Sequence, residues 1–367
     1  MRIGFDAREV RYRKGIATYS QNLLRCFADL GLEVVVFCED SRKDIMPRSS
    51  FFEFVTANMD PLASFGRSGF RALVQRAQVD LLHVPSPWAP TPIPVRLVST
   101  MHDVTPFLYP RSVPATLRLR YRRQLSETLH QSRRVITVSK ILFSTLSIYA
   151  RVDPAKVRVI HNGVAERFSP QMDGAILAAV RRRYSLPERF AFWAGDFRPE
   201  KNVRFLLDAW SRLGRRLAEL PTLVLAGAHK LEYRQLRDEA QRRSLQDKVL
   251  FPGFIGDEDL PAVYSAAEIF VFPSLAEGFG LPPLEAMACG TPCVVSNSSS
   301  LPEVTGSAAL LFDPTCLEAF ESCVARVLTE PDLRATLREE GLRRAGGFSW
   351  TKAADETLEV YRGALGG

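Results

Sequence analysis

Short apolar runs that end in polar loops recur along this chain and alternate with segments of helical periodicity. In the first half they occupy residues 1–6, 32–38, 81–84, 96–101, 135–138 and 157–160. After the first run, Tyr19, Leu23, Leu24 and Phe27 recur at the spacing of one helix face. Strands that alternate with helices predict a parallel sheet with helices on both faces.

The same alternation restarts near residue 190, with apolar runs at 190–195, 223–227, 249–252, 269–272 and 292–296. Helical segments separate them, at 203–213, 231–243, 260–266 and 284–288. We therefore predict an α/β protein of two Rossmann-like, doubly wound parallel-sheet domains that face a central cleft. The predicted domains are residues 1–165 and 166–349, with a final helix, 350–367, that returns to the first domain. Ligands would bind at the carboxyl ends of the strands.

The composition is that of an ordinary globular protein, with 46% hydrophobic and 24% charged residues. The longest apolar runs, such as 32–38 and 266–272, fall short of the roughly 20 residues that a membrane-spanning helix needs. The first residues lack the apolar core of a signal peptide. The six cysteines show no metal or redox spacing, so we expect them to be buried and reduced. A cytoplasmic location is the expectation.

Basic charge is concentrated in the first half of the chain. Residues 1–165 hold 24 Lys and Arg against 13 Asp and Glu, whereas the remainder holds 24 against 28. This asymmetry predicts an anionic partner for the first half. Residues 111–134 contribute Arg111, Arg118, Arg120, Arg122, Arg123, Arg133 and Arg134.

Within that basic segment, Leu117, Tyr121, Leu125 and Leu129 recur at helical spacing, with most arginines off the apolar stripe. Such a helix suits a peripheral enzyme on the anionic inner face of a membrane. A solvated surface helix is the alternative interpretation. No nucleic-acid-binding motif accompanies these arginines, so no nucleic-acid partner is expected.

The most informative segment, SLAEGFGLPPLEAMACGTP, covers residues 274–292 and follows an expected strand. Gly278 and Gly280 allow close backbone approach to a ligand, and the prolines after them start a helix. A helix N-terminus behind a glycine loop suits a phosphate. Glu277 and Glu285 would repel that phosphate and should instead accept hydrogen bonds from hydroxyl groups. A sugar nucleotide supplies both, whereas a merely capped helix is the alternative.

Glu277 and Glu285, at this spacing within EGFGLPPLEAMACGTP, resemble the signature of retaining GT-B glycosyltransferases of family 4. The chain also resembles bacterial mannosyltransferase-type members, and the resemblance covers nearly the whole chain in the family's order. Its other landmarks are Gly15-Ile16, MHDVTPFLYP (101–110), ITVSK (136–140), VIHNGV (159–164), AGDFRPEKN (194–202) and SLPEV (300–304).

The resemblance implies that Glu277 binds the donor hexose and Glu285 the ribose of the nucleotide. It also implies that backbone amides of Phe279, Gly280 and Leu281 bind sugar and phosphate. The base would lie beside Gly253, Phe254 and Ile255.

Arg198 and Lys201 are implied to bind the diphosphate, where preorganised cations stabilise the leaving group. Many relatives have Pro-Arg-Lys-Asn, whereas this chain has Pro199-Glu200-Lys201-Asn202 with its arginine at 198. The alternative is a solvated basic loop.

Several candidates follow strands in the first domain. His102 is expected to bind and orient the donor sugar, and Asp103 either to hold the His102 ring or to contact the acceptor. Gly15 follows Arg13-Lys14 where relatives often have two glycines, and it is expected near the donor phosphate or acceptor. Asn162 is assigned to donor binding and Ser139 to the acceptor or to orientation, with structural roles as the alternative for both.

The resemblance implies a retaining hexosyltransferase. It is expected to use no metal or other cofactor, because cations take the place of a metal at the leaving group. The expected donor is GDP-mannose, and the expected acceptor is a saccharide or lipid-linked oligosaccharide of surface polysaccharide synthesis. The same-fold alternatives are a UDP-sugar donor, a sugar-nucleotide epimerase or a phosphorylase. A non-catalytic protein that binds anions or a membrane surface is the alternative of a different class.

Overall fold

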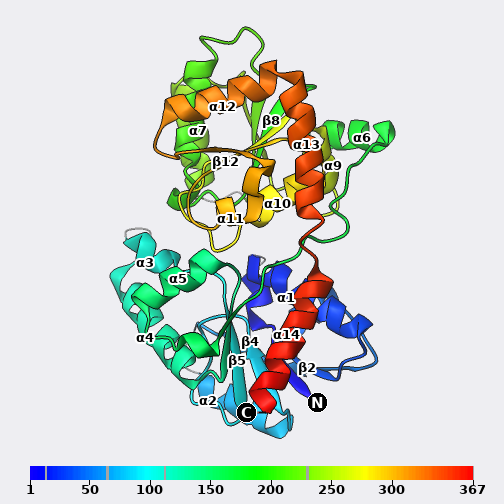
Figure 1. The fold of residues 1–367 in the computed structure, drawn as a ribbon, viewed down its shortest axis with the longest axis vertical. Coiled ribbons are helices and arrows are strands. Elements are labelled where there is room, and N and C mark those ends of the chain that lie inside the picture. Colours follow the sequence, from blue (N-terminus) through cyan, green and yellow to red (C-terminus); the bar gives the residue numbers. More distant parts are fainter. Residues whose placement is uncertain (13–14, 63–65, 111–112, 229–230, 367) are drawn as a thin grey trace. The chain divides into compact units, whose positions relative to one another are not determined.

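The chain divides into two compact units, each built around one parallel sheet (Figure 1). The computed structural model describes all residues except 13–14, 63–65, 111–112, 229–230 and 367. The N-terminal unit comprises Met1–Gly163 and Ser349–Gly367, and the C-terminal unit comprises Val164–Phe348. The predicted divisions, after residues 165 and 349, lie within two residues of these positions.

The sheet of the N-terminal unit has the strand order β3-β2-β1-β4-β5-β6-β7, with every pair parallel. β1 lies inside it, because Ile3 pairs with Val34 on one side and with Leu81 on the other. The direction of strand addition reverses between β1 and β4. The strands are β1 (Ile3–Asp6), β2 (Val34–Cys38), β3 (Phe52–Thr56), β4 (Leu81–Val84), β5 (Arg96–Met101), β6 (Arg134–Thr137) and β7 (Val157–Val159).

Helices cover both faces of this sheet. Successive strand residues point to opposite sides, so neighbouring residues of β4 show what packs on each face. On one face, Leu82 packs in a core with Phe37 of β2 and Phe70 of α2. On the other, the buried His83 ring contacts the hydroxyl of Tyr361 in α14 through Nδ1 (2.5 Å). The helices are α1 (Gly15–Asp29), α2 (Arg67–Arg76), α3 (Thr105–Leu108), α4 (Ala115–Gln131), α5 (Lys140–Tyr149) and α14 (Trp350–Leu365), besides the 3-10 helices η1 (Arg8–Tyr12), η2 (Asp40–Ile45) and η4 (Pro154–Lys156).

The C-terminal unit repeats this design with the strand order β10-β9-β8-β11-β12-β13, again all parallel. Its strands are β8 (Phe190–Ala194), β9 (Thr222–Ala226), β10 (Val249–Gly253), β11 (Ile269–Phe272), β12 (Cys293–Ser296) and β13 (Leu310–Phe312). Its helices are α6 (Gly174–Tyr184), α7 (Val203–Leu213), α8 (Leu231–Arg242), α9 (Leu260–Ala266), α10 (Leu281–Ala288), α11 (Leu301–Thr305), α12 (Leu317–Thr329) and α13 (Pro331–Ala345), with the 3-10 helices η5 (Pro199–Lys201) and η6 (Gly306–Ala308).

Three sequence expectations need correction. The helix expected near 284–288 begins at Leu281, so that the prolines expected to start it do lie in its first turn. Leu117 is exposed, since the buried face of α4 is formed by Tyr121, Leu125 and Leu129 with polar partners. Of the six cysteines, Cys26, Cys316 and Cys323 are only partly buried. Among the described residues, no helix combines the length and apolar character needed to cross a bilayer.

Candidate active site

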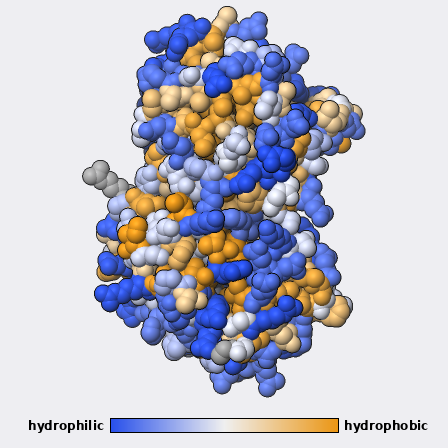
Figure 2. Space-filling model, in the orientation of Figure 1, coloured by the Kyte–Doolittle hydropathy of each residue, from blue (hydrophilic) through white to orange (hydrophobic). Residues whose placement is uncertain are grey.

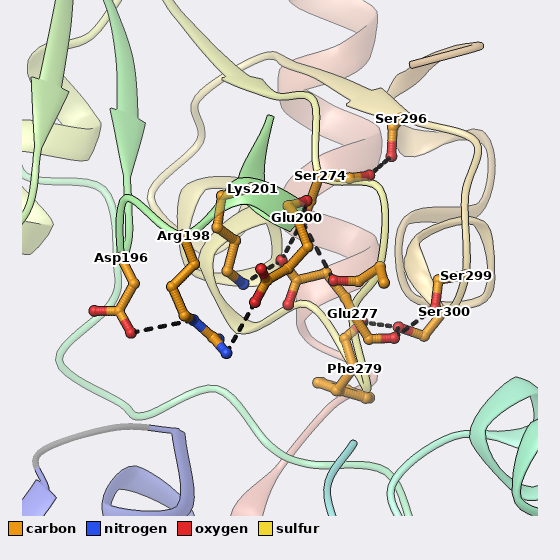
Figure 3. A network of polar contacts seen from close by, with 11 residues as sticks. Asp196, Arg198, Glu200, Lys201, Ser274, Glu277, Phe279, Ser296, Ser299 and Ser300 are labelled. Atoms are coloured by element: carbon orange, nitrogen blue, oxygen red, sulfur yellow. Dashed lines mark hydrogen bonds and ion pairs between the residues drawn. The ribbon is translucent and has the colours of Figure 1, made fainter. Parts of the chain in front are cut away.

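The loop between β11 and α10 is fixed by serine side chains from the segment after β12 (Figure 3). The Ser299 and Ser300 hydroxyls donate to the backbone oxygen of Glu277, at 2.6 and 2.9 Å. Ser300 also lies 2.7 Å from the Phe279 oxygen. These bonds set the backbone from which the Glu277 side chain projects. Sequence reasoning missed them because Ser299 and Ser300 lie more than 20 residues from their partners.

Lys201 and Glu277 form an ion pair, which Figure 3 shows at the centre of the network. The Lys201 Nζ lies 2.5 Å from the Glu277 Oε1, and the Ser274 hydroxyl donates to the same oxygen at 2.7 Å. Both side chains are only 12–13% exposed. The structure thus brings together a cation and a carboxylate that the sequence assigned to neighbouring parts of one donor.

Lys201 is held in place by the residue after it. Asn202 adopts a left-handed backbone conformation, with φ of 56°, between η5 and α7. Its amide nitrogen donates to the backbone oxygens of Pro273 (3.3 Å) and Pro314 (3.0 Å). Pro273 directly follows β11, so these bonds fasten the Lys201 loop to the Glu277 loop.

Arg198, the second predicted cation, is half-exposed and already paired. Its Nη1 lies 2.8 Å from the Glu200 Oε1, and its Nε lies 3.7 Å from the Asp196 Oδ2. The Glu200 side chain is almost fully buried, so this pair fixes the arginine on the loop. An anion at Arg198 would share the guanidinium with two carboxylates, whereas Lys201 has one partner in Figure 3.

The start of α10 requires glycine. Gly280 has a φ of 116°, and a Cβ there would lie 2.7 Å from the Leu301 Cδ2. Leu281 follows as the first helical residue, and the two prolines after it carry no N–H. An anion at this helix end would therefore be bound by amides at and before Leu281. Phe279 is buried, with its ring centroid 5.9 Å from that of Phe348.

Glu285 lies in the second turn of α10 and contacts Tyr264. The tyrosine hydroxyl donates to its Oε2 at 3.1 Å. Burial raises the pKa of Glu285 to about 7, while the Tyr264 bond and the charge of Arg167 oppose that shift. Tyr264 was not among the residues predicted from sequence.

The segment predicted to border the base follows β10. Gly253 has a φ of 84°, Phe254 is 57% exposed and Ile255 is buried. Next to them the Tyr184 hydroxyl accepts the N–H of Gly256 at 3.0 Å. The exposed Phe254 ring is the one aromatic surface among the three predicted positions.

His102 lies in the N-terminal unit, directly after β5. Its ring packs edge-on against Tyr19, with centroids 4.7 Å apart. Its Nε2 is buried and has no hydrogen-bond partner in the described chain. Burial lowers the pKa of His102 to about 3, so the imidazole is neutral at pH 7. The Asp103 carboxylate accepts the N–H of Thr105 at 3.2 Å, which orients the start of α3.

The other predicted residues of this unit differ in their surroundings. Ser139 caps α5, because its hydroxyl accepts the N–H of Leu142 at 3.1 Å. Asn162 is 4% exposed, and its Oδ1 has no partner among the described residues. Gly15 is the first residue of α1, and a Cβ there would have no atom within 4 Å. Arg13, Lys14 and Arg111 lie outside the described residues.

Apolar side chains are exposed on the surface formed by α3, α4 and α5. Figure 2 shows hydrophobic colouring over α3 and α5. Leu119 and Ile148 are 71% and 78% exposed. They line one shallow depression together with Phe107, Ala115, Arg118, Arg122 and Tyr149. Basic and apolar groups thus share this surface, which we call the α4–α5 patch.

No three His, Cys, Asp or Glu side chains in the described part of the chain are grouped so that they could hold a metal ion.

Comparison with known proteins gives matches over both units. Residues 181–344 match the family described as "Glycosyl transferases group 1", and residues 13–167 match "Glycosyltransferase Family 4". O-antigen chain mannosyltransferase B of Escherichia coli is 33% identical over 270 residues, which cover 73% of this chain and 70% of that protein. Serotype-specific mannosyltransferase WbdA of Escherichia coli is 31% identical over 276 residues, 73% of this chain but only 34% of WbdA.

Solved structures share the fold over almost the entire chain. Sucrose-phosphate synthase from Thermosynechococcus elongatus superposes with a TM-score of 0.83 and 22% identity, covering 99% of this chain and 98% of that one. HepE from Anabaena, solved in complex with UDP-glucose, superposes with a TM-score of 0.80 and 18% identity, covering 99% of each chain. These neighbours show that the two sheets form a GT-B fold.

Proposed function

The chain belongs to the group 1, family 4 glycosyltransferases, and on that premise we propose that it transfers a hexose from a nucleotide sugar with retention of configuration. The proposed acceptor is a saccharide or lipid-linked oligosaccharide of surface polysaccharide synthesis. The buried Lys201–Glu277 pair carries this proposal, because it places one cation and one hydroxyl-binding carboxylate side by side. The names of the Escherichia coli relatives support the choice of acceptor class.

The proposed donor is GDP-mannose, in keeping with the mannosyltransferase relatives. Glu277 binds hydroxyl groups of the mannose, and Glu285 binds the ribose. Gly253, Phe254 and Ile255 border the base, with the exposed Phe254 ring available for stacking. The backbone of Phe279, Gly280 and Leu281 binds the sugar and the phosphates at the start of α10.

Departure of the nucleoside diphosphate is the step at which charge develops. Lys201, assisted by Arg198, stabilises the negative charge on the leaving diphosphate, in the manner of other preorganised cationic sites. The departing phosphate takes the proton of the acceptor hydroxyl as the new glycosidic bond forms on the same face of the sugar. Neutral His102 binds and orients the donor sugar. We propose that the reaction needs no metal or other cofactor.

Donor identity is tested by thermal unfolding with GDP-mannose, GDP, UDP-glucose and UDP, without added metal. A ligand at 100 times its Kd is expected to stabilise the protein by about 2.7 kcal/mol and to shift Tm by several degrees. We expect the largest shift with guanosine ligands and release of GDP when a mannosyl acceptor is added. A Tm shift with uridine ligands alone would mean that the donor is a UDP-sugar and not GDP-mannose. No shift with any nucleotide would contradict the transferase proposal.

We propose that the enzyme binds an anionic membrane surface through residues 111–134 and reaches its acceptor there. The α4–α5 patch supplies the apolar contact, with Leu119 and Ile148 most exposed. Arg118 and Arg122 line the same depression and supply its positive charge. These groups suit a lipid-linked diphosphate at the headgroup level. No nucleic-acid partner is proposed.

Membrane binding is tested by sedimentation with vesicles of phosphatidylcholine that contain or lack phosphatidylglycerol. Replacing Arg118 and Arg122 together with serine is expected to weaken binding to the anionic vesicles about 30-fold, since each basic residue near the surface contributes about 1 kcal/mol. The matched control replaces Arg234 and Arg237 of α8, which are exposed and carry the same charge. Equal losses of vesicle binding in both double variants would show that only the net charge matters, and would contradict binding through the α4–α5 patch.

A further inference from the structure

Glu9 lies at the position where an open parallel sheet most often binds its ligand. It belongs to η1, which follows the carboxyl end of β1, and Ser86 follows the carboxyl end of β4. β1 and β4 are neighbours, and the direction of strand addition reverses between them. Ligands of doubly wound sheets bind at such a reversal, outside the carboxyl ends of the strands.

The Glu9 carboxylate is only half satisfied. The Ser86 side chain interacts with it and lowers its pKa. The Ser86 hydroxyl accepts the N–H of Trp88 at 3.2 Å, so its proton is available for Glu9. The Glu9 Oε1 is buried without a hydrogen-bond partner in the described chain. The neighbouring cation is already committed, because Arg8 holds Asp6 in a buried ion pair of 2.7 Å.

The surroundings of Glu9 favour a hydroxyl-bearing ligand. Burial raises the pKa of Glu9 to about 7. The charges of Asp6 and Asp103 act in the same direction, while Ser86 and the charge of Arg8 oppose the shift. His102 and Asn162, at the same edge of the sheet, also contribute buried polar atoms without partners in the described chain: the His102 Nε2, and the Asn162 Oδ1, which is an acceptor. Buried acceptors need donors, and hydroxyl groups of a sugar supply them without added charge.

We propose that Glu9 binds a hydroxyl group of the acceptor saccharide and so contributes to acceptor specificity. The inference rests on the proposed function, since it presupposes a sugar acceptor. The carboxylate accepts the hydroxyl hydrogen at Oε1 while Ser86 fixes the other side of the group. Neither the motifs nor the spacing in the sequence indicated Glu9.

The test compares wild type with Glu9→Gln in steady-state transfer from the donor to a panel of methyl mannosides and mannobioses. The variant keeps an acceptor oxygen but loses the charge, so it is expected to raise the acceptor KM about 10-fold, because a charge-assisted hydrogen bond is roughly twice as strong as a neutral one. The donor KM and the nucleotide-induced Tm shift should stay within twofold of wild type. Asp29→Asn, at an exposed position in α1, is the control and should leave all three unchanged.

An acceptor KM of Glu9→Gln within twofold of wild type would overturn the inference while leaving the proposed function intact. If wild type transfers no sugar from any nucleotide sugar to this panel, the proposed function fails, and the inference fails with it. Should Glu9→Gln not fold, as judged by circular dichroism, Ser86→Ala decides. Loss of its hydroxyl should raise the acceptor KM in the same direction, and an unchanged KM would overturn the inference.

Discussion

Replacing Lys201 with alanine is expected to lower kcat about 10²- to 10³-fold, the loss typical of one preorganised group that stabilises developing charge. The ammonium group lies in a mostly buried position, where water screens it little. Without it, the leaving diphosphate would face the Glu277 carboxylate uncompensated. The measurement is release of the nucleoside diphosphate under saturating donor and acceptor.

The ion pair makes the effects of Lys201 and Glu277 interdependent. Glu277→Ala alone removes the carboxylate that binds the sugar and leaves Lys201 without its 2.5 Å partner. We expect the double variant to be no slower than about the worse single variant, because groups that act as a unit are not additive. Fully additive losses would contradict a shared role.

Two further basic residues calibrate this result. Arg198→Ala is expected to lower kcat only about 10-fold, because the guanidinium already shares its charge with Glu200 and Asp196. Lys248→Ala, at an exposed position of the same unit, should leave kcat within twofold of wild type. If the kcat of Lys201→Ala is close to that of Lys248→Ala, Lys201 does not stabilise the leaving diphosphate.

Interior strands could be predicted from sequence because burial is continuous along them, whereas among the helices α2, α5, α6, α12 and α13 were not predicted. The runs at 81–84, 96–101 and 269–272 are strands with these bounds, and the helix at 203–213 is as expected. The strands missed, β3 and β13, lie at sheet edges and are only partly buried. An edge strand covered on one side carries a weaker apolar signal.

The candidate site was predictable where its residues share one loop and not where they meet through the fold. Lys201 and Glu277 stand in recognisable motifs, although their 2.5 Å contact joins positions 76 residues apart. The Tyr264 partner of Glu285 and the serines that hold the Glu277 backbone depend on packing between elements. Neither hydrophobic periodicity nor motif spacing in a sequence predicts such contacts.

Replacing Gly163 with alanine is expected to destabilise the N-terminal unit by about 3 kcal/mol, the upper range for forcing atoms into a packed site. A Cβ there would lie 2.2 Å from the Trp350 nitrogen and 2.5 Å from the Ser349 carbonyl carbon. Both are backbone atoms and cannot rotate away as a side chain could. The backbone of Ser349 and Trp350, at the start of α14, would have to move away from Gly163, which follows β7.

That displacement would shift α14, whose first residue packs against Gly163. The helix is anchored by the buried contact of Tyr361 with His83, so a shift at its first residue costs packing at the sheet. We expect the Tm measured by circular dichroism to fall by about 10 °C. Gly174→Ala, at the start of α6, is the matched control, because a Cβ there has no atom within 4 Å. Equal Tm values for the two variants would show that the backbone at Gly163 yields without cost, and the close approach of the two segments would then not contribute to stability.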